Sequence, residues 1–281
     1  MNFELNNFVW NGVLNLSPWG LVIYTAIVTF LTILTVTIYL HRTGAHLALK
    51  LHAWVQHAFR AWLWLTTGMR TKEWVAIHRK HHATVDTEND PHSPIWKGKW
   101  NFLWKGVGYY VVAARDQETM EKYGHGTPDD WIERNLYTPH NFLGVGVLLG
   151  LINVILFGLP GLLVWGVQAI WIPLFAAGII NGWGHFVGYQ NYKRGDPRYP
   201  NVEYSTNIFW WGILIGGEEL HNNHHADGTS PFFAHRWFEF DVGGLVVKIL
   251  CLLRLAELRK PLVPKNLFER MYLRFFNLSA A

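Results

Sequence analysis

The stretch from Trp19 to Leu40 reads WGLVIYTAIVTFLTILTVTIYL and contains no Lys, Arg, Asp or Glu. As a helix it would be about 33 Å long, which is enough to cross the hydrocarbon core of a bilayer. A second, longer uncharged stretch runs from Asn141 to Gly184, and Pro160-Gly161 divides it near the middle. We therefore expect spans over residues 19–40, 141–159 and 162–184, the last two forming a helical hairpin. Three buried helices of a soluble core are disfavoured, because such helices rarely run so long without a charge.

The basic residues predict the orientation of these spans. All 24 Lys and Arg lie in residues 41–140 or 185–281, and none lies in 1–40 or 141–184. Because cytoplasmic segments carry an excess of Lys and Arg, both polar segments are predicted to be cytoplasmic, with the segment before Trp19 outside or at the interface. Residues 47–67 and 244–257 are apolar with interspersed basic residues, which is typical of helices lying in the membrane plane.

Composition excludes several classes of protein. Of the 281 residues, 50% are hydrophobic and only 16% are charged, so the chain is not disordered. A single Cys excludes a disulfide framework, a zinc ribbon and an iron–sulfur protein. The net charge of +4 is mild, and no basic run interleaves with aromatic residues, so nucleic-acid binding is not expected. Residues 1–18 lack the basic start and the small-residue cleavage site of a signal peptide. The sequence thus predicts one all-α integral membrane domain over residues 1–281.

Three histidine clusters fall at the predicted cytoplasmic face. They are His41-Arg-Thr-Gly-Ala-His46, His78-Arg-Lys-His81-His82 and His221-Asn-Asn-His224-His225, and His185 adds a single residue at the end of the hairpin. The first and last clusters lie far apart in the chain, so their convergence at one face follows from the predicted topology. Six other histidines fit no ligand spacing and are expected to be ordinary interfacial or loop residues: His52, His57, His92, His125, His140 and His235.

The spacing indicates metal binding. On a helix, residues i, i+3 and i+4 share a face, so each HxxHH segment is expected to direct its three imidazoles into one site. His41 and His46 are five residues apart, about 140° around an α-helix, so they cannot face one ion on a straight helix. Either Gly44 breaks the helix or the two histidines serve different ions. Neutral imidazole suits Zn, Cu, Fe and Ni, and nine ligands are too many for one ion. The pattern therefore predicts two metals. No HExxH motif indicates a zinc protease.

The order of these clusters resembles the membrane-bound fatty acid desaturases, and the sequence around them resembles the acyl-CoA (Δ9, stearoyl-CoA) branch, bacterial type. The resemblance rests on WVAIHRKHHATVDTENDPHSP at 74–94, NGWGHFVGYQNY at 181–192 and GEELHNNHHADGTS at 217–230, and it runs from about residue 19 to 240. It implies a transmembrane helical stalk under a helical cytoplasmic cap, here 41–140 and 185–281. It also implies a kinked acyl tunnel.

The resemblance also implies a ligand set for two iron ions. Carried onto this sequence, it comprises nine histidines and Asn181, which binds one iron through water: His41, His46, His78, His81, His82, His185, His221, His224, His225 and Asn181. The implied reaction inserts a cis double bond, expected at Δ9, into a saturated acyl chain carried by CoA or a lipid. O2 and two external electrons are consumed and two waters are released.

Further residues are candidates for supporting roles. Six acidic residues could orient the imidazoles or could be caps and solvated side chains: Asp86, Glu88, Asp90, Glu218, Glu219 and Asp227. Thr25 and Thr29 could set the tunnel's far end, or could be ordinary span residues. Arg42, Arg79, Lys80 and Arg236 could meet a phosphate-bearing headgroup or CoA, or could be positive-inside anchors.

The sequence has neither the Cys set of a ferredoxin or rubredoxin nor a haem-binding extension. A separate donor is therefore expected on the cytoplasmic face: ferredoxin, rubredoxin or a cytochrome b5-like protein with its reductase. Trp54, Trp62, Trp64 and Trp74 could relay electrons or anchor the protein at the interface. The compact length suggests a bacterial inner-membrane protein.

Two departures from the family pattern stand out. The segment before Trp19 is too short for a complete span, where the family has a further one and four spans in total. The third His cluster is preceded by Gly217-Glu218-Glu219-Leu220, which adds a carboxylate of unassigned role.

Other functions stay open at this point. A related membrane di-iron hydroxylase of alkyl, sterol or carotenoid substrates shares the histidine pattern. A membrane metal-binding or transport protein is a non-enzyme alternative, although transporters usually place ligands near mid-membrane. A scaffold without catalysis is a third.

Overall fold

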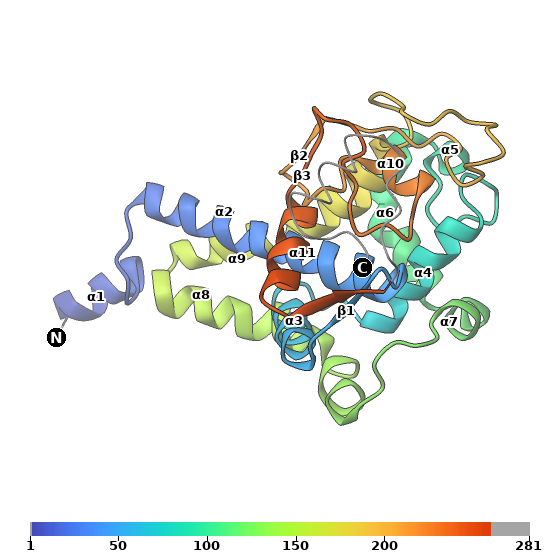
Figure 1. Cartoon of the computed structure of the whole chain (residues 1–281). Helices are drawn as coiled ribbons and strands as arrows, with labels where there is room; N and C mark the ends of the chain where they lie inside the picture. Colours follow the sequence, from blue (N-terminus) through green and yellow to red (C-terminus); the bar gives the residue numbers. More distant parts are fainter. Residues whose placement is uncertain (1, 260–281) are drawn as a thin grey trace.

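The computed structural model describes residues 2–259 and is mostly helical (Figure 1). The helices, with π-helices written η, are α1 (Asn2–Asn11), α2 (Pro18–Thr35), η1 (Val36–Ala45), α3 (Ala53–Thr66), α4 (Thr71–Ala83), α5 (Pro94–Lys97), α6 (Lys99–Ala114), α7 (Gln117–Tyr123), η2 (Glu133–Tyr137), η3 (Leu143–Leu148), α8 (Leu149–Phe157), α9 (Pro160–Ile172), η4 (Pro173–Trp183), α10 (His221–Ala226) and α11 (Val242–Leu252). The strands are β1 (Leu49–Leu51), β2 (Trp211–Gly212), β3 (Phe240–Asp241) and β4 (Ala256–Leu258). Helices α2, α8 and α9 project from a broad cap that holds most of the other elements (Figure 1).

The first predicted span forms one continuous helix of 28 residues, Pro18–Ala45, made of α2 and η1. It begins at a standard cap, where the Ser17 hydroxyl accepts from the Gly20 N–H at 3.2 Å and Pro18 occupies the first turn. Within residues 2–259 this is the one helix long and apolar enough to cross a membrane. Its last ten residues have π geometry, with hydrogen bonds between residues five apart.

The predicted hairpin also forms. The chain turns at Gly158 and Leu159, so that α8 and α9 lie side by side (Figure 1). Their contact is close, because a Cβ on Gly161 would lie 2.1 Å from the Asn153 carbonyl oxygen. Asn153 also donates to Gln168 at 2.9 Å between the two arms. The apolar arms Leu143–Phe157 and Pro160–Ile172 are shorter than the first helix, so the expectation of three spans is met by length in one case only.

The expectation of an all-α fold is wrong in detail. β1 pairs antiparallel with β4, Leu49 opposite Leu258, and β2 pairs in parallel with β3. Because β1 occupies residues 49–51, the helix expected over 47–67 begins at Ala53. Likewise, α11 ends at Leu252 and the chain continues into β4, where one helix over 244–257 was predicted.

The core of the cap surrounds the end of the first helix. Ile38 and Leu40 of η1 are buried against Leu49 of β1 and Val247 of α11 in one apolar cluster. Segments far apart in the sequence, β1 and α11, therefore pack against the segment that carries His41. This packing positions the histidines described next.

Candidate metal centre

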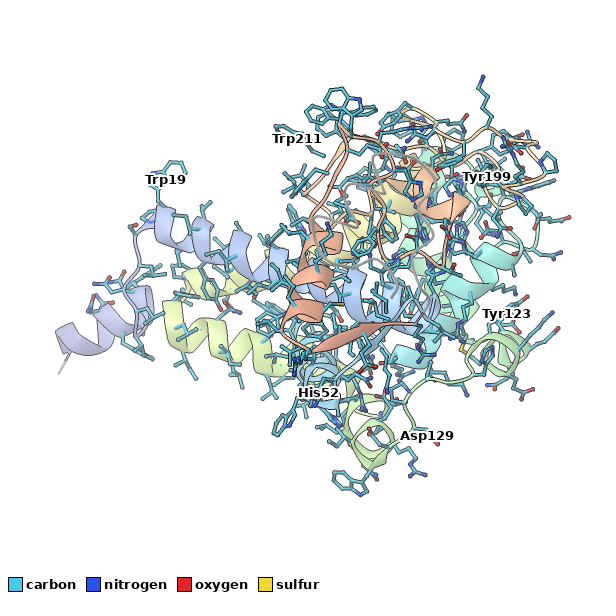
Figure 2. The ribbon with its side chains drawn as sticks, in the orientation of Figure 1. Trp19, His52, Tyr123, Asp129, Tyr199 and Trp211 are labelled. Atoms are coloured by element: carbon cyan, nitrogen blue, oxygen red, sulfur yellow. The ribbon has the colours of Figure 1, made fainter. Side chains whose placement is uncertain are left out.

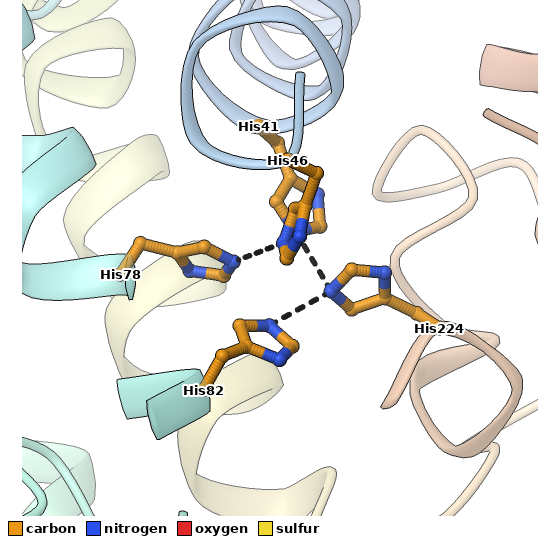
Figure 3. A group of neighbouring side chains, drawn as sticks. All are labelled: His41, His46, His78, His82 and His224. Carbon is orange, nitrogen blue, oxygen red and sulfur yellow. Dashed lines mark hydrogen bonds between the residues drawn. The ribbon is translucent and has the colours of Figure 1, made fainter. Parts of the chain in front are cut away.

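Five histidines from three segments form one group, the five-His group (Figure 3). They are His41 and His46 at the end of η1, His78 and His82 on α4, and His224 on α10. Each can offer one ring nitrogen such that all these atoms lie within 4.8 Å of one another. The Nε2 atoms face each other: His41 and His224 are 3.0 Å apart, and His46 and His78 are 2.9 Å apart.

The π-helix explains why His41 and His46 share a site. In a π-helix the backbone bond joins residues five apart, and here the His46 N–H donates to the His41 carbonyl at 3.0 Å. Residues five apart then lie on the same side, and the two ring centroids are 4.8 Å apart. Both sequence-based alternatives were wrong. Gly44 does not break the helix. Because it has no Cβ, Val75 can pack closely against it; a Cβ at this position would lie only 2.9 Å from Val75 Cγ2.

Four further histidines form a second group, the four-His group. They are His81 on α4, His185 after η4, and His221 and His225 on α10. The Nε2 of His221 lies 3.1 Å from that of His185 and 3.0 Å from that of His225. All four side chains are buried.

Each HxxHH segment divides its histidines between the two groups. His78 and His82 enter the five-His group while His81 enters the four-His group. On α10 the division is reversed, since His221 and His225 enter the four-His group and His224 the other. The i, i+4 pair points one way and the intervening residue points another. The prediction that each segment fills a single site was therefore wrong.

The nitrogen spacing fits a metal ion at each group. A His–metal bond is about 2.1 Å long, so neighbouring ligand nitrogens about 90° apart are separated by about 3.0 Å. The Nε2 contacts in both groups lie between 2.9 and 3.3 Å. Lone pairs that face one another at this spacing repel unless a cation or a shared proton lies between them. The donor set is all imidazole, which suits iron among other transition metals.

The surroundings favour neutral imidazoles, the form that binds metal. Burial, together with neighbouring histidines, lowers the pKa of His46, His78, His82 and His224 in the five-His group. The same causes lower the pKa of His221 and His225 in the four-His group. His81 differs from the other histidines. Burial lowers its pKa, but the nearby carboxylates, chiefly Asp90, raise it by more, so the net shift is upward.

Carboxylates orient several of these rings. In the five-His group, Glu218 faces His41 Nδ1 at 2.6 Å and also accepts from the Thr37 hydroxyl. Burial raises the pKa of Glu218, but His41, Arg42 and Thr37 together lower it by more, so the net shift is downward. A carboxylate on Nδ1 leaves Nε2 free to bind a metal and fixes the ring.

The four-His group has more such partners. Asp90 faces His81 Nδ1 at 2.9 Å and Asp86 faces His185 Nδ1 at 2.8 Å. Although burial raises both carboxyl pKa values, the histidine contacts lower them overall. His225 Nδ1 lies 2.9 Å from the backbone carbonyl of Asn201, a partner that side-chain patterns in the sequence could not reveal.

The other three acidic candidates lie elsewhere. Glu88 is exposed, and Asp227 follows α10 and accepts from the Thr229 hydroxyl at 3.2 Å. Glu219 is buried, and it accepts from the backbone N–H groups of Ile215 at 2.7 Å and Gly217 at 3.2 Å. Burial raises the pKa of Glu219 to about 7. Its contacts order the loop that carries Glu218.

Sequence reasoning missed His92, which was expected to be an ordinary loop residue. It is 6% exposed, its ring centroid lies 4.6 Å from that of His81, and its Nε2 has no hydrogen-bond partner within residues 2–259. Burial lowers the pKa of His92 to about 3. Its place in the Asp90-Pro91-His92 triplet, directly after a carboxylate that orients a ligand, was the available signal.

A cavity of about 720 Å³ adjoins the five-His group. Its wall includes His41 and His78 of that group, along with His92, Asn181 and Glu218. Most of the remaining wall is apolar and includes Ile33, Val36, Ile77, Phe102, Val107, Val111, Ile172, Ile180 and Ile215. Charged and polar side chains also line it, among them Arg70, Glu73, Arg115 and Gln117. None of the four-His ligands is in this wall. The volume falls in the range of about 300–1,000 Å³ typical of ligand pockets.

The residues expected at the far end of a tunnel do not line this cavity. Thr25 and Thr29 bond back to the carbonyls of Leu21 and Thr25, each at 2.7 Å, within their own helix. The first helix instead meets the cavity from Ile33 onward.

The four basic residues expected at a headgroup have partners inside the protein. Arg42 is fully buried and donates to both oxygens of Asp241, at 2.9 and 3.1 Å, so the expectation of headgroup contact is wrong for this residue. Arg79 donates to four backbone carbonyls, those of Gly44, Ala45, Tyr123 and His125. Lys80 contacts Asp116 at 3.1 Å, and the exposed Arg236 donates to Asn191 at 3.1 Å.

The four tryptophans differ in position. Trp74 stacks on His78 with ring centroids 4.8 Å apart, so it contacts the five-His group directly. Trp62 donates to Thr32 of α2, Trp64 donates to the His140 carbonyl, and Trp54 is 79% exposed on α3.

Comparison with known proteins identifies the family. The fatty acid desaturase family model matches residues 17–237. The sn-1 stearoyl-lipid 9-desaturase of Synechocystis sp. is 30% identical over 223 residues, which cover 79% of this chain and 66% of that protein. The corresponding desaturase of Anabaena variabilis is 29% identical, covering 79% of this chain and 77% of that protein. Delta-9 acyl-lipid desaturase 1 of Arabidopsis thaliana is 29% identical, covering 79% and 70%. These names specify acyl lipids, so the narrower expectation of an acyl-CoA branch is not supported by them. The match over residues 17–237, which include all nine clustered histidines, shows that this chain belongs to the membrane fatty acid desaturase family.

Proposed function

We propose that this protein is an O2-dependent desaturase that introduces a cis Δ9 double bond into a saturated acyl chain. The observation that carries the proposal is the pair of adjacent histidine groups, one of which borders a largely apolar cavity. The position of the double bond is supported by the names of three relatives, which are 9-desaturases or Delta-9 desaturases.

The two groups would hold two iron ions, with His41, His46, His78, His82 and His224 on one and His81, His185, His221 and His225 on the other. Asn181 lines the cavity and would bind one of the two ions through water. When bound, the two ions supply the redox chemistry that activates O2 and removes two hydrogens from adjacent methylenes. The chain's own residues orient the ligands through Glu218, Asp86 and Asp90.

The cavity wall positions the acyl chain and excludes water. Ile33 and Ile215 line it together with His41, so an extended chain in the cavity would pass beside the five-His group. An apolar wall would hold one pair of adjacent carbons near the metal ligands. It would also exclude water and so prevent side reactions with it.

For the acyl carrier we propose a membrane lipid. The three relatives described above are named for acyl-lipid substrates. Of the basic residues first considered for CoA, Arg42, Arg79 and Lys80 are held by internal partners.

We further propose that Pro18–Ala45 and the hairpin cross a membrane, with the histidines on its cytoplasmic face, in a bacterial inner membrane. A separate ferredoxin, rubredoxin or cytochrome b5-like donor would supply electrons there.

The proposal is tested by the fatty acid profile of a host that lacks its own desaturase, with the wild type expressed beside His81→Ala. We expect a new monounsaturated acid with the wild type only, and fragmentation of the product gives the bond position. Hydroxylated products in its place would indicate a hydroxylase of the same metal chemistry. Incubation of membranes with labelled acyl-CoA and with labelled acyl lipid distinguishes the two carriers, and we expect product from the lipid.

A further inference from the structure

Strands β2 and β3 lie at the edge of the cap from which α2 and the hairpin project (Figure 1), and exposed aromatic side chains gather in and beside these strands. We call this surface the aromatic edge and define it by its members, which are 38–78% exposed: Phe209, Trp210, Trp211, Ile213, Leu214, Trp237, Phe238 and Phe240. The parallel pairing of Trp211 with Phe240 joins its two segments. Trp210 and Trp211 contact each other, with ring centroids 4.5 Å apart, and Figure 2 shows Trp211 at the outer edge of the cap. An apolar surface of this kind indicates an interaction site.

The aromatic edge is fixed to the first helix near its cytoplasmic end. A Cβ on Gly216 would lie 2.9 Å from Thr37 Cγ2 and 3.1 Å from Ile33 Cγ2, so the loop that carries Leu214 packs directly on that helix. Ile33 lies fourteen residues beyond Trp19. At 1.5 Å per residue this is about 21 Å along the helix, and Thr37 is about 27 Å along it. Because the hydrocarbon core is about 30 Å thick, the edge lies at the depth of the cytoplasmic interface.

The chemistry of the edge matches that depth. Residues 208–217 read IFWWGILIGG and contain no charged side chain. Tryptophan is enriched where hydrocarbon meets headgroups, because its ring is apolar and its N–H can face water. The exposed Arg236 lies beside Trp237 in the sequence, and a cation at the rim favours contact with anionic headgroups.

From these observations we propose that the aromatic edge inserts into the cytoplasmic leaflet as a second membrane contact of the cap. The inference rests on the proposed transmembrane orientation of Pro18–Ala45. The lipid surface is the occupant because the edge is continuous with the span and has its depth. Insertion would seat the cap against the leaflet that contains the lipid-bound acyl chains.

Site-directed spin labelling in nanodiscs of phosphatidylcholine and phosphatidylglycerol tests the proposal on the full chain. The single cysteine is first removed as Cys251→Ser, and one label is then placed at Leu214→Cys, where the leucine is 71% exposed. Glu121→Cys is the matched control, because Glu121 is also exposed but lies on α7 at the opposite edge of the cap (Figure 1). Ile23→Cys reports on the span itself, since Ile23 is 57% exposed on α2. Collision with O2, which concentrates in lipid, is compared with collision with water-soluble chromium oxalate.

We expect the label at position 214 to collide more with O2 than with chromium oxalate, as at position 23, and the label at 121 to show the reverse. If position 214 behaves like 121 while 23 is exposed to lipid, the aromatic edge does not insert and the span stands. If position 23 also behaves like 121, the transmembrane orientation is wrong and the depth argument fails with it. Spin–spin broadening at 214 would show that a second copy of the chain covers the edge, which would also overturn the proposal.

Discussion

The five-His and four-His groups share helices α4 and α10 but are held in different ways. In the five-His group His46 and His82 are only partly buried, and among the described residues a single carboxylate, Glu218, contacts a ligand ring. In the four-His group all ligands are buried, and three of the four rings have an Nδ1 partner, supplied by Asp90, Asp86 and the Asn201 carbonyl. The cavity wall includes ligands of the first group only. The difference indicates an enclosed site beside a more open one that borders the cavity.

The largest effect is expected from removing one ligand at a time. His224→Ala should empty the five-His group and His221→Ala the four-His group, leaving about one iron per chain in each case. Desaturation should fall by more than about 100-fold in both, because ligand loss exceeds the effect of losing an outer-shell partner. Iron content by mass spectrometry and product analysis provide the measurements. Retention of both irons by either variant would contradict the assignment.

The carboxylate partners should separate the groups next. Asp90→Asn should weaken iron binding in the four-His group, and Glu218→Gln should weaken it in the five-His group, each by about 10–100-fold. Competition with a chelator of known affinity measures this. Glu88→Gln is the matched control, since Glu88 is exposed and should change nothing. If either variant lost iron affinity equally in both groups, the assignment of Asp90 to the four-His group and of Glu218 to the five-His group would be contradicted.

Acid should destabilise the iron-free protein through both groups. Burial lowers the pKa of four histidines in the folded state: His82, His224, His221 and His225. In the unfolded chain these side chains have the ordinary histidine pKa of about 6.5, so below that pH the unfolded state binds more protons than the folded state. Their contribution to the free energy of unfolding is therefore present above about pH 6.5 and is lost as the pH falls. The melting temperature of iron-free protein should be lower at pH 5.5 than at pH 8. An unchanged or higher value at pH 5.5 would contradict this.

Iron removal by a chelator should occur in two phases. The partly exposed five-His group, which borders the cavity, should release its iron first, and the buried four-His group should release its iron later. His224→Ala should show only the slow phase, which assigns the phases. A single phase in the wild type would indicate equal access.

The smallest effect is expected at the cavity wall. Ile33→Phe narrows the cavity near the five-His group and should shift the products toward shorter acyl chains. Thr25→Val removes a hydroxyl that bonds within its own helix and should leave the chain-length profile unchanged. The fatty acid profiles of the two variants are compared directly. A shift with Thr25→Val alone would restore the original expectation for the tunnel.

The sequence predicted the large features because they depend on local patterns. The uncharged run before His41, the turn near Pro160 and the histidine spacing each reflect a simple period or an absence of charge. The convergence of distant histidines followed from the positions of the basic residues, which indicated one membrane face.

The missed features depend on geometry that no local pattern encodes. The α-helical period separates His41 from His46, and only the π-helix brings them together. His81 is separated from His78 because it is grouped with His185, His221 and His225, which come from segments distant in the sequence. The sequence suggested that Arg42 is an anchoring cation, because its partner Asp241 is distant in the sequence and could not be inferred from it. The short pairing of β1 with β4 joins distant segments that appear helical when read alone.

The most direct test is anomalous diffraction at the iron edge from crystals of the iron-loaded protein. The account predicts two peaks, one among the Nε2 atoms of His41, His46, His78, His82 and His224, and one among those of His81, His185, His221 and His225. A single peak, or a peak shared by all three histidines of one HxxHH segment, would contradict the two-group centre.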